Sequence, residues 1–298
     1  KSKLILILVF AFSSLPIFAQ YEPWVQIMKG IDIPNLNIPL LSSTEELIYA
    51  CDIFQGLFSS SDNGNNWKFV GPEFLDSSAI NANIFATSLL TFDHTIIIGN
   101  ASYGLYLSSD DGNNWTQINI DPVLFPPDTL WDTYPYTYGY VVESLIKNDT
   151  FIFAATTKDG IYRSSDKGLT WSRTNYGGIE AIRYMYSSGK NIYAGGEHFA
   201  FKSTDNGDTW VDLLSTPYLI KTMAVNDDGV HFAGMYTQGL IKSTDDGASW
   251  VKTNLPNMGV YDIEFYKEFV IINAYGKFKG SGWDEAGVFL SPDNGDSW

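Results

Sequence analysis

The stretch SSDDGNNW at residues 108–115 decides the fold of this chain, because close variants of it occur five more times. The other copies are SSDNGNNW at 60–67, SSDKGLTW at 164–171, STDNGDTW at 203–210, STDDGASW at 243–250 and SPDNGDSW at 291–298. The shared aspartate recurs roughly every 40 to 50 residues, a period typical of stacked supersecondary units. The sequence therefore predicts a repeat architecture.

Each octapeptide predicts a tight turn between two strands. The aspartate can accept N–H bonds across the turn, the glycine allows a positive φ, and the serine or threonine adds a local hydrogen bond. The tryptophan then begins the next strand and turns its ring into the space between neighbouring sheets. We assign a structural role to the following residues: Asp62, Gly64, Trp67, Asp110, Gly112, Trp115, Asp166, Gly168, Trp171, Asp205, Gly207, Trp210, Asp245, Gly247, Trp250, Asp293, Gly295 and Trp298.

Short β-rich runs surround each turn. A glycine and an apolar-alternating run such as GLYLSSD, from Gly104, precede most copies, and runs such as HTIIIGN and VVESLI lie further upstream. A strand such as WTQI follows the tryptophan. No segment has the 3.6-residue periodicity of an amphipathic helix, so the pattern predicts four antiparallel strands per repeat.

The pattern S/T-x-D-x-G-x-x-W resembles the Asp box, or bacterial neuraminidase repeat. This repeat occurs in sialidase-like, sortilin-type, xyloglucanase-type and photosystem-assembly propellers. The resemblance covers about residues 56–298 and implies an all-β, six-bladed β-propeller of four-stranded antiparallel blades with Asp-box turns, either complete or part of a larger ring. Enzymes and binding proteins share the repeat, so it does not determine activity.

The segment PWVQI at 23–27 is similar to the fourth strand of a blade, and the sixth repeat has no such strand after Trp298. We expect residues 24–27 to pair with the 287–291 strand and complete the sixth blade. The alternative is that the parent protein continues into further blades.

The N-terminal residues 1–19 resemble a signal peptide, with a basic KSK followed by a long apolar run. We expect residues 20–298 to form one Asp-box propeller, truncated at its C-terminus, that is secreted or displayed at the cell surface. No later run is long and apolar enough to span a bilayer. Cys51 is the only cysteine, which excludes an intrachain disulfide, and its context LIYAC predicts a buried strand.

The chain is acidic, with 34 Asp+Glu against 18 Lys+Arg and a net charge of −16. This balance excludes nucleic acid and anionic membranes as partners, and it disfavours a photosystem assembly factor, which uses basic patches. The turns lack the alternating oxygen ligands and terminal glutamate of a calcium loop. We expect a monomer with no metal or cofactor and with a glycan or an extracellular protein as partner.

The resemblance implies that ligands bind on the face opposite the aspartates. Two long connections on that face, 120–140 and 274–286, combine aromatic side chains with carboxylates, which suits sugar rings. The alternative is that these aromatics pack their own loops, and that Glu197 and His198 only order a loop. The ligand-binding candidates are Trp131, Asp132, Tyr138, Glu197, His198, Tyr236, Trp283, Asp284 and Glu285.

Enzyme and binding protein remain the two competing interpretations. Sialidases hold the substrate carboxylate with three arginines from separate blades, whereas the arginines here, Arg163, Arg173 and Arg183, lie close together in the sequence. A hydrolase of neutral polysaccharide needs only two carboxylates, so that alternative stays open. Such enzymes usually pair two propellers. We therefore favour a non-catalytic module that recognises glycan or protein, and we assign no catalytic residue.

Overall fold

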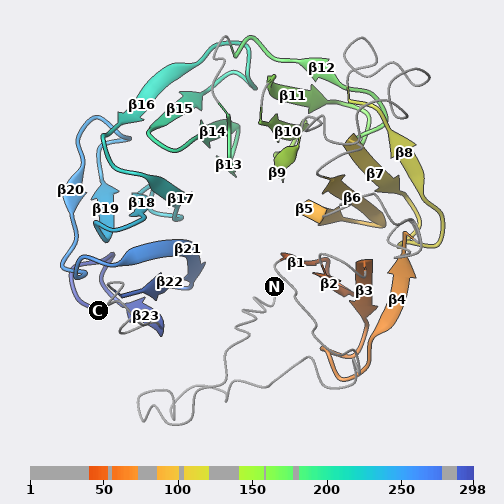
Figure 1. The fold of residues 1–298 in the computed structure, drawn as a ribbon, viewed down its shortest axis with the longest axis horizontal. Coiled ribbons are helices and arrows are strands. Elements are labelled where there is room, and N and C mark those ends of the chain that lie inside the picture. The colour runs from red at the N-terminus through yellow and green to blue at the C-terminus, as the bar shows by residue number, and fades with distance from the viewer. Residues whose placement is uncertain are drawn as a thin grey trace, which may run out of the picture. The chain divides into compact units, whose positions relative to one another are not determined.

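The computed structural model describes residues 40–52, 56–72, 86–100, 104–120, 141–157, 159–176, 181–276 and 287–298. All regular structure in these ranges is β-strand, arranged in six antiparallel sheets, so the prediction of an all-β fold is confirmed (Figure 1). In the described chain no helix is long and apolar enough to cross a membrane. The predicted signal peptide, 1–19, lies outside these ranges.

The chain divides into two compact units, and the first comprises residues 1–119 and 126–139. It contains two four-stranded sheets, which we call sheet A and sheet B. Sheet A consists of β1 (Leu40–Ser43), β2 (Ile48–Asp52), β3 (Gly56–Ser60) and β4 (Lys68–Gly71). Sheet B consists of β5 (Ala86–Phe92), β6 (Thr95–Asn100), β7 (Gly104–Ser108) and β8 (Thr116–Ile118).

The second unit comprises residues 120–125 and 140–298 and contains sheets C to F. Sheet C consists of β9 (Val142–Lys147), β10 (Ile152–Thr156), β11 (Gly160–Ser164) and β12 (Ser172–Arg173). Sheet D consists of β13 (Tyr184–Ser188), β14 (Asn191–Gly195), β15 (Phe199–Ser203) and β16 (Val211–Ser215). Sheet E consists of β17 (Ile220–Val225), β18 (His231–Met235), β19 (Leu240–Ser243) and β20 (Val251–Lys252). Sheet F consists of β21 (Gly259–Tyr266), β22 (Phe269–Tyr275) and β23 (Gly287–Ser291).

Four-stranded antiparallel sheets are thus confirmed for A to E, while the described chain supplies three strands to sheet F. The fourth strand predicted for this sheet, residues 24–27, lies outside the described ranges.

Within every sheet the strands pair in chain order, and this order separates two ends. The first strand begins at one end, where the connection between the second and third strands also lies. We call this the strand-start end. The octapeptide turns, which we call the aspartate turns, join the third and fourth strands and therefore lie at the opposite end of each sheet.

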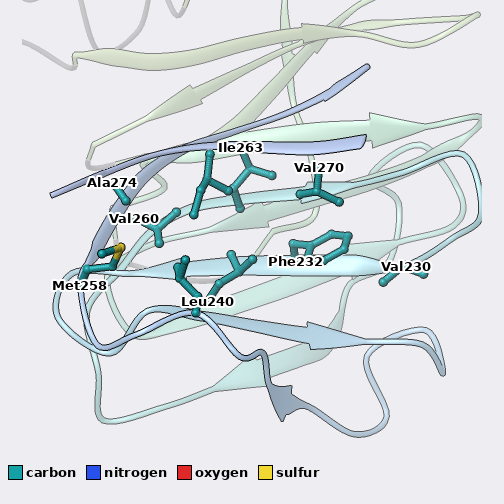
Figure 2. Close-up of a cluster of buried hydrophobic side chains, with 10 residues drawn as sticks. Val230, Phe232, Leu240, Met258, Val260, Ile263, Val270 and Ala274 are labelled. Carbon is teal, nitrogen blue, oxygen red and sulfur yellow. The ribbon is translucent and has the colours of Figure 1, made fainter. Parts of the chain in front are cut away.

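Buried aliphatic and aromatic side chains join consecutive sheets within each unit. The second strands, such as β10 (IFAAT) and β18 (HFAGM), are buried along their whole length, as expected for strands covered on both faces. Between sheets E and F, Phe232 and Leu240 pack with Val260, Ile263 and Val270 (Figure 2). In sheet A, Cys51 is fully buried as predicted. The sheet-to-sheet core therefore fixes the strand-start ends relative to one another within each unit.

The aspartate turns share one hydrogen-bond pattern. At residues 108–115 the Asp110 Oδ1 accepts from the Asn114 N–H at 2.8 Å and from the Ser108 hydroxyl at 2.8 Å. The N–H of Gly112 donates to the Ser108 Oγ at 2.9 Å, and this glycine has φ +87°. Each carboxylate therefore accepts donors from both sides of its turn.

The tryptophans at the ends of these turns are half-buried between sheets. The Trp115 indole N–H lies 2.9 Å from the Val70 carbonyl oxygen in sheet A and 3.0 Å from the Gly112 carbonyl oxygen in its own turn. Trp250 donates in the same way from sheet E to the Leu213 carbonyl oxygen in sheet D, at 3.3 Å. The ring and the indole nitrogen thus connect one sheet to the preceding one.

The residue after each aspartate has a φ between 53° and 60°, and in the turns of sheets B, D, E and F it contacts the preceding sheet. This position, which we call the joint residue, was not identified from the sequence. Its partners in the preceding sheet differ from joint to joint: Tyr49 for Asp111, Asn148 and Arg163 for Asn206, Lys202 for Asp246, and Asn226 and Lys242 for Asn294. Asp111 and Asp246 each contact a histidine of their own sheet as well, His94 and His231.

Candidate functional site

The first strands of sheets B, C, E and F each carry one extra residue near their start. In sheet E, Ile220 pairs with Met235 and Thr222 pairs with Gly234, so Lys221 is the bulged residue between them. The same reasoning identifies Thr87 in sheet B, Glu143 in sheet C and Tyr261 in sheet F. A β-bulge bends its strand and redirects a side chain. In the second unit the bulges present Glu143, Lys221 and Tyr261 at the strand-start end.

A charged group lies at the strand-start end of sheets C and D. Arg183 immediately precedes β13, and its backbone N–H donates to the Gly195 carbonyl oxygen at 2.8 Å. Its Nη1 lies 3.4 Å from the Glu143 Oε1, and its Nη2 lies 3.1 Å from the Glu197 Oε1. Burial raises the pKa of Glu143, and the charge of Arg183 partly offsets this rise. One guanidinium therefore holds carboxylates from two sheets.

Backbone hydrogen bonds bring the predicted residues Glu197, His198 and Tyr236 to one rim. The carbonyl oxygens of Glu197 and His198 accept N–H bonds from the connection 216–220, at 2.7 and 3.0 Å. The N–H of Tyr236 donates to the Leu219 carbonyl oxygen in that same connection, at 2.8 Å. The side chain of Glu197 pairs with Arg183, so a Glu197–His198 acid–base pair is not the arrangement observed.

An aromatic group continues this rim across sheets E and F. The Nζ of Lys221 lies 5.1 Å from the ring centroid of Tyr236 and 5.9 Å from that of Tyr261. Tyr261 meets Tyr236 edge to face at 6.1 Å and Tyr275 at 5.1 Å. All three tyrosines are half-buried, while Lys221 is exposed. The rings thus offer partly accessible faces and hydroxyls beside an ammonium.

Gly259 allows the tyrosines to approach so closely. A Cβ at this position would lie 2.6 Å from the Tyr236 carbonyl oxygen and 2.9 Å from the Tyr261 ring. Burial raises the pKa of the Tyr261 hydroxyl, and the neighbouring Tyr236 and Tyr275 raise it further. The Tyr261 hydroxyl therefore stays protonated at neutral pH and can donate a hydrogen bond.

Two carboxyl groups lie along β21, at Asp262 and Glu264. Both side chains keep accessible surface, yet the surrounding protein atoms desolvate their charged forms and raise the pKa of each. For Glu264 desolvation and then the charge of Asp262 raise the pKa to about 7. A carboxyl group with this pKa can hold a proton near neutral pH.

The arginines are all engaged by acids. Arg163 pairs with Asp208 at 2.8 Å, and Arg173 pairs with Asp159 at 3.2 Å. Arg183 holds the two glutamates described above. Arg163 lies beside the aspartate turn of sheet D, at the opposite end from Arg183, so the three guanidinium groups do not converge on one site.

Six of the nine predicted ligand-binding residues lie outside the described ranges: Trp131, Asp132, Tyr138, Trp283, Asp284 and Glu285. The described part of the chain adds three residues that sequence reasoning missed, namely Glu143, Lys221 and Tyr261. All three residues lie near the start of the first strand of their sheet, but a β-bulge leaves no clear pattern in the sequence. Within the described ranges no group of three or more His, Cys, Asp or Glu residues is placed to hold a metal ion.

Comparison with known proteins shows the fold and no more. No protein-family profile matches the sequence, and no curated protein is detectably similar to it. Among solved structures, YCF48 bound to D1 peptide is 16% identical with a TM-score of 0.62, over 91% of this chain and 85% of that chain. These values support a β-propeller fold.

Two glycoside hydrolases are similar in the same way. The Niastella koreensis GH74 enzyme is 16% identical with a TM-score of 0.63, over 88% of this chain and 45% of that chain. The GH74 xyloglucanase from Xanthomonas campestris is 14% identical with a TM-score of 0.60, over 85% and 43%. This chain therefore spans less than half the length of either enzyme.

Proposed function

We propose that this chain is a six-bladed propeller of the Asp-box type that recognises a glycan or an extracellular protein without catalysis, at the strand-start end. The observation that carries the proposal is the rim formed by Arg183, Glu197, Lys221, Tyr236 and Tyr261. It combines ring faces, hydroxyls and an ammonium on rigid strand starts. These groups bind sugars and polypeptides alike.

The pairing of the rim carboxylates supports binding rather than hydrolysis. Glycoside hydrolysis needs one carboxylic acid and one carboxylate that are free to reach the scissile bond. Arg183 holds Glu143 and Glu197 together, which keeps both engaged with a fixed cation. YCF48, which is similar to this chain over most of its own length, has a peptide bound in its structure.

Export, a monomeric state and closure by residues 24–27 belong to the same proposal. They are supported by the signal-like residues 1–19 and by the strand-like PWVQI segment. Size-exclusion chromatography with light scattering tests the monomer, and expression with and without residues 1–19 tests export.

A binding comparison across the two ends tests the recognition surface. Purified protein is applied to a glycan array and to a pull-down from extracellular extract, beside the double variants Tyr236→Ala/Tyr275→Ala and Trp131→Ala/Trp283→Ala. Leu169→Ser is the matched control, because Leu169 is 59% exposed within an aspartate turn at the opposite end. We expect both double variants to lose the ligand and the control to keep it. Loss of the ligand in Leu169→Ser, with binding retained in both double variants, would place the ligand on the aspartate turns.

A hydrolase of neutral polysaccharide is the second candidate, and Glu264 favours it. A carboxyl group with a pKa of about 7 is suited to general acid catalysis. Release of reducing ends from xyloglucan or another neutral glycan, abolished by Glu264→Gln and retained by Glu268→Gln, would establish this activity. Absence of release with every neutral glycan tested would leave recognition as the function.

A further inference from the structure

Among the described residues, the ammonium of Lys221 contacts tyrosine rings and no carboxylate. In the described ranges, ion pairs join Arg163, Arg173, Arg183, Lys202 and Lys242 to acidic side chains, and Lys221 is not among these cations. Its Nζ is within 6 Å of two ring centroids, which is the geometry of a cation–π contact. At an exposed position such contacts are weak enough to be exchanged.

The rings form a rigid seat for an ammonium group. Tyr261 is held edge to face between Tyr236 and Tyr275, and Gly259 lets the chain pass close behind it. The lysine bulges out of β17, whereas two of the rings come from sheet F. The tyrosine rings therefore come from elements other than β17, which supplies the lysine. Lys221 can leave while the rings stay in place.

The charge of the chain favours a cationic guest. The net charge of the chain is −16, from 34 Asp+Glu against 18 Lys+Arg. An acidic surface attracts basic partners and repels anionic ones. Charge and ring geometry thus select the same kind of ligand.

We propose that the tyrosine seat binds a lysine side chain of a basic protein segment, and that Lys221 is a built-in competitor which this segment displaces. The inference rests on the proposed recognition function and specifies its partner. A protein is favoured over a glycan because the group already seated on the rings is the ammonium of a lysine side chain.

The competitor role makes an unusual prediction: removing Lys221 strengthens binding. Without it, the guest no longer competes for two cation–π contacts, so Lys221→Met should bind a penta-lysine peptide about five- to tenfold more tightly than the parent protein does. The matched control is Lys267→Met. Lys267 also lies 5.1 Å from a tyrosine ring centroid, that of Tyr266, but at the opposite end of β21, and its loss changes the net charge equally.

The experiment is isothermal titration of the parent protein and both variants with penta-lysine and with penta-(Nε-acetyl-lysine). The proposal expects a gain in Lys221→Met alone, no binding of the acetylated peptide, and loss of the gain in Lys221→Met/Tyr261→Leu. Melting temperatures of all variants verify folding. Equal affinities of the two lysine variants for penta-lysine, or weaker binding by Lys221→Met, overturns the proposal.

A glycan outcome is distinguished by a third ligand, a chitosan oligosaccharide, whose ammonium groups lie on sugars. If the gain in Lys221→Met appears only with chitosan, the guest is an amino sugar and the assignment to a protein is wrong. If the lysine variants behave alike while the Tyr236→Ala/Tyr275→Ala variant loses another ligand, the recognition function stands without this inference. If Lys221→Met shows no gain and Tyr236→Ala/Tyr275→Ala loses no ligand, the recognition function and this inference are both wrong.

Discussion

The indole nitrogen of Trp115 donates a hydrogen bond of 2.9 Å to the carbonyl oxygen of Val70, in the neighbouring sheet. Gly112 closes against the same residue, since a Cβ on that glycine would lie 2.9 Å from the Val70 carbonyl oxygen. The aspartate turn and the tryptophan of sheet B therefore pack against β4, the outer strand of sheet A. The octapeptide closes its own hairpin and also holds the sheet before it.

Replacing Trp115 should destabilise the first unit in two separable steps. Trp115→Phe keeps an aromatic ring but loses the indole donor, and should lower the free energy of unfolding by about 1 kcal/mol. Trp115→Ala also removes the half-buried ring, and should lower it by about 2–4 kcal/mol. Urea denaturation followed by fluorescence measures both, and unchanged midpoints would contradict the structural role of the turn.

The joint between sheets D and E should show coupling between Lys202 and Asp246. The Lys202 side chain is 10% exposed and its ammonium contacts the Asp246 carboxylate, which itself is 61% exposed. Because one partner is open to solvent, we expect a coupling free energy of only about 0.5–1.5 kcal/mol. A double-mutant cycle with Lys202→Met and Asp246→Asn measures it, and additive effects would show that the contact does not stabilise the joint.

Two histidines should give pH dependences of opposite sign. Burial lowers the pKa of His231 below 6.5, and the hydrogen bond and charge of Asp246 only partly oppose this. The folded state then binds fewer protons than the unfolded state, so stability is present above about pH 6.5 and falls as the pH decreases below it. Thermal melts between pH 5 and 8 should show this loss in the parent protein and a reduced loss in His231→Gln.

His94 is the internal comparison for this measurement. Its hydrogen bond with Asp111, and then the charge of Asp111, raise its pKa above 6.5. Its contribution is therefore present below pH 6.5 and is lost as the pH rises through the folded pKa. His94→Gln should change the melts in the opposite sense to His231→Gln, and shifts of the same sign in both variants would refute these assignments.

Acid should weaken the aspartate turns together. Hydrogen bonds from the Thr209 side chain and backbone, and then from Ser203, lower the pKa of Asp205 to about 2. Such a carboxylate stabilises the fold above its unfolded pKa near 3.8, and this contribution disappears as the pH falls toward 2. Asp205→Asn should therefore be less stable than the parent protein at pH 7, and most of this difference should be gone by pH 2. A difference as large at pH 2 as at pH 7 would show that charge is not the cause.

Sialidase activity should be absent. Arg163 lies at the aspartate-turn end and Arg183 at the strand-start end, so the three guanidiniums of the chain cannot converge on a sialic acid carboxylate. The purified protein should release no fluorophore from a sialoside. Turnover that disappears in Arg183→Ala would overturn this reasoning.

The sheets were predictable from the sequence because their signals are local. Aspartate, glycine and tryptophan at fixed spacing determine each turn, and β-rich runs such as HTIIIGN determine the strands beside it. The regular order of these signals gave antiparallel four-stranded sheets, which the structure confirms in sheets A to E.

The rim was less predictable because it depends on register. Lys221 reaches the tyrosines through a one-residue bulge in β17, and this shift arises from pairing with β18 rather than from a local motif. Glu197 was chosen as a candidate, but its partner Arg183 precedes β13, 14 residues earlier in the sequence, and the pair became visible only through the fold. The joint residues were missed for the same reason, since most of their partners belong to the preceding sheet.

The joint residues have a consequence for how a chain of near-identical hairpins finds its correct order. Across the joint Asp111 meets the phenol of Tyr49, Asn206 meets an amide and a guanidinium, and Asp246 meets the ammonium of Lys202. A hairpin docked beside the wrong neighbour would lose these matches, even though its turn and tryptophan would fit. The joint residue thus distinguishes one hairpin from another, and this difference disfavours the exchange of sheets, which is a characteristic misfolding of repeat proteins.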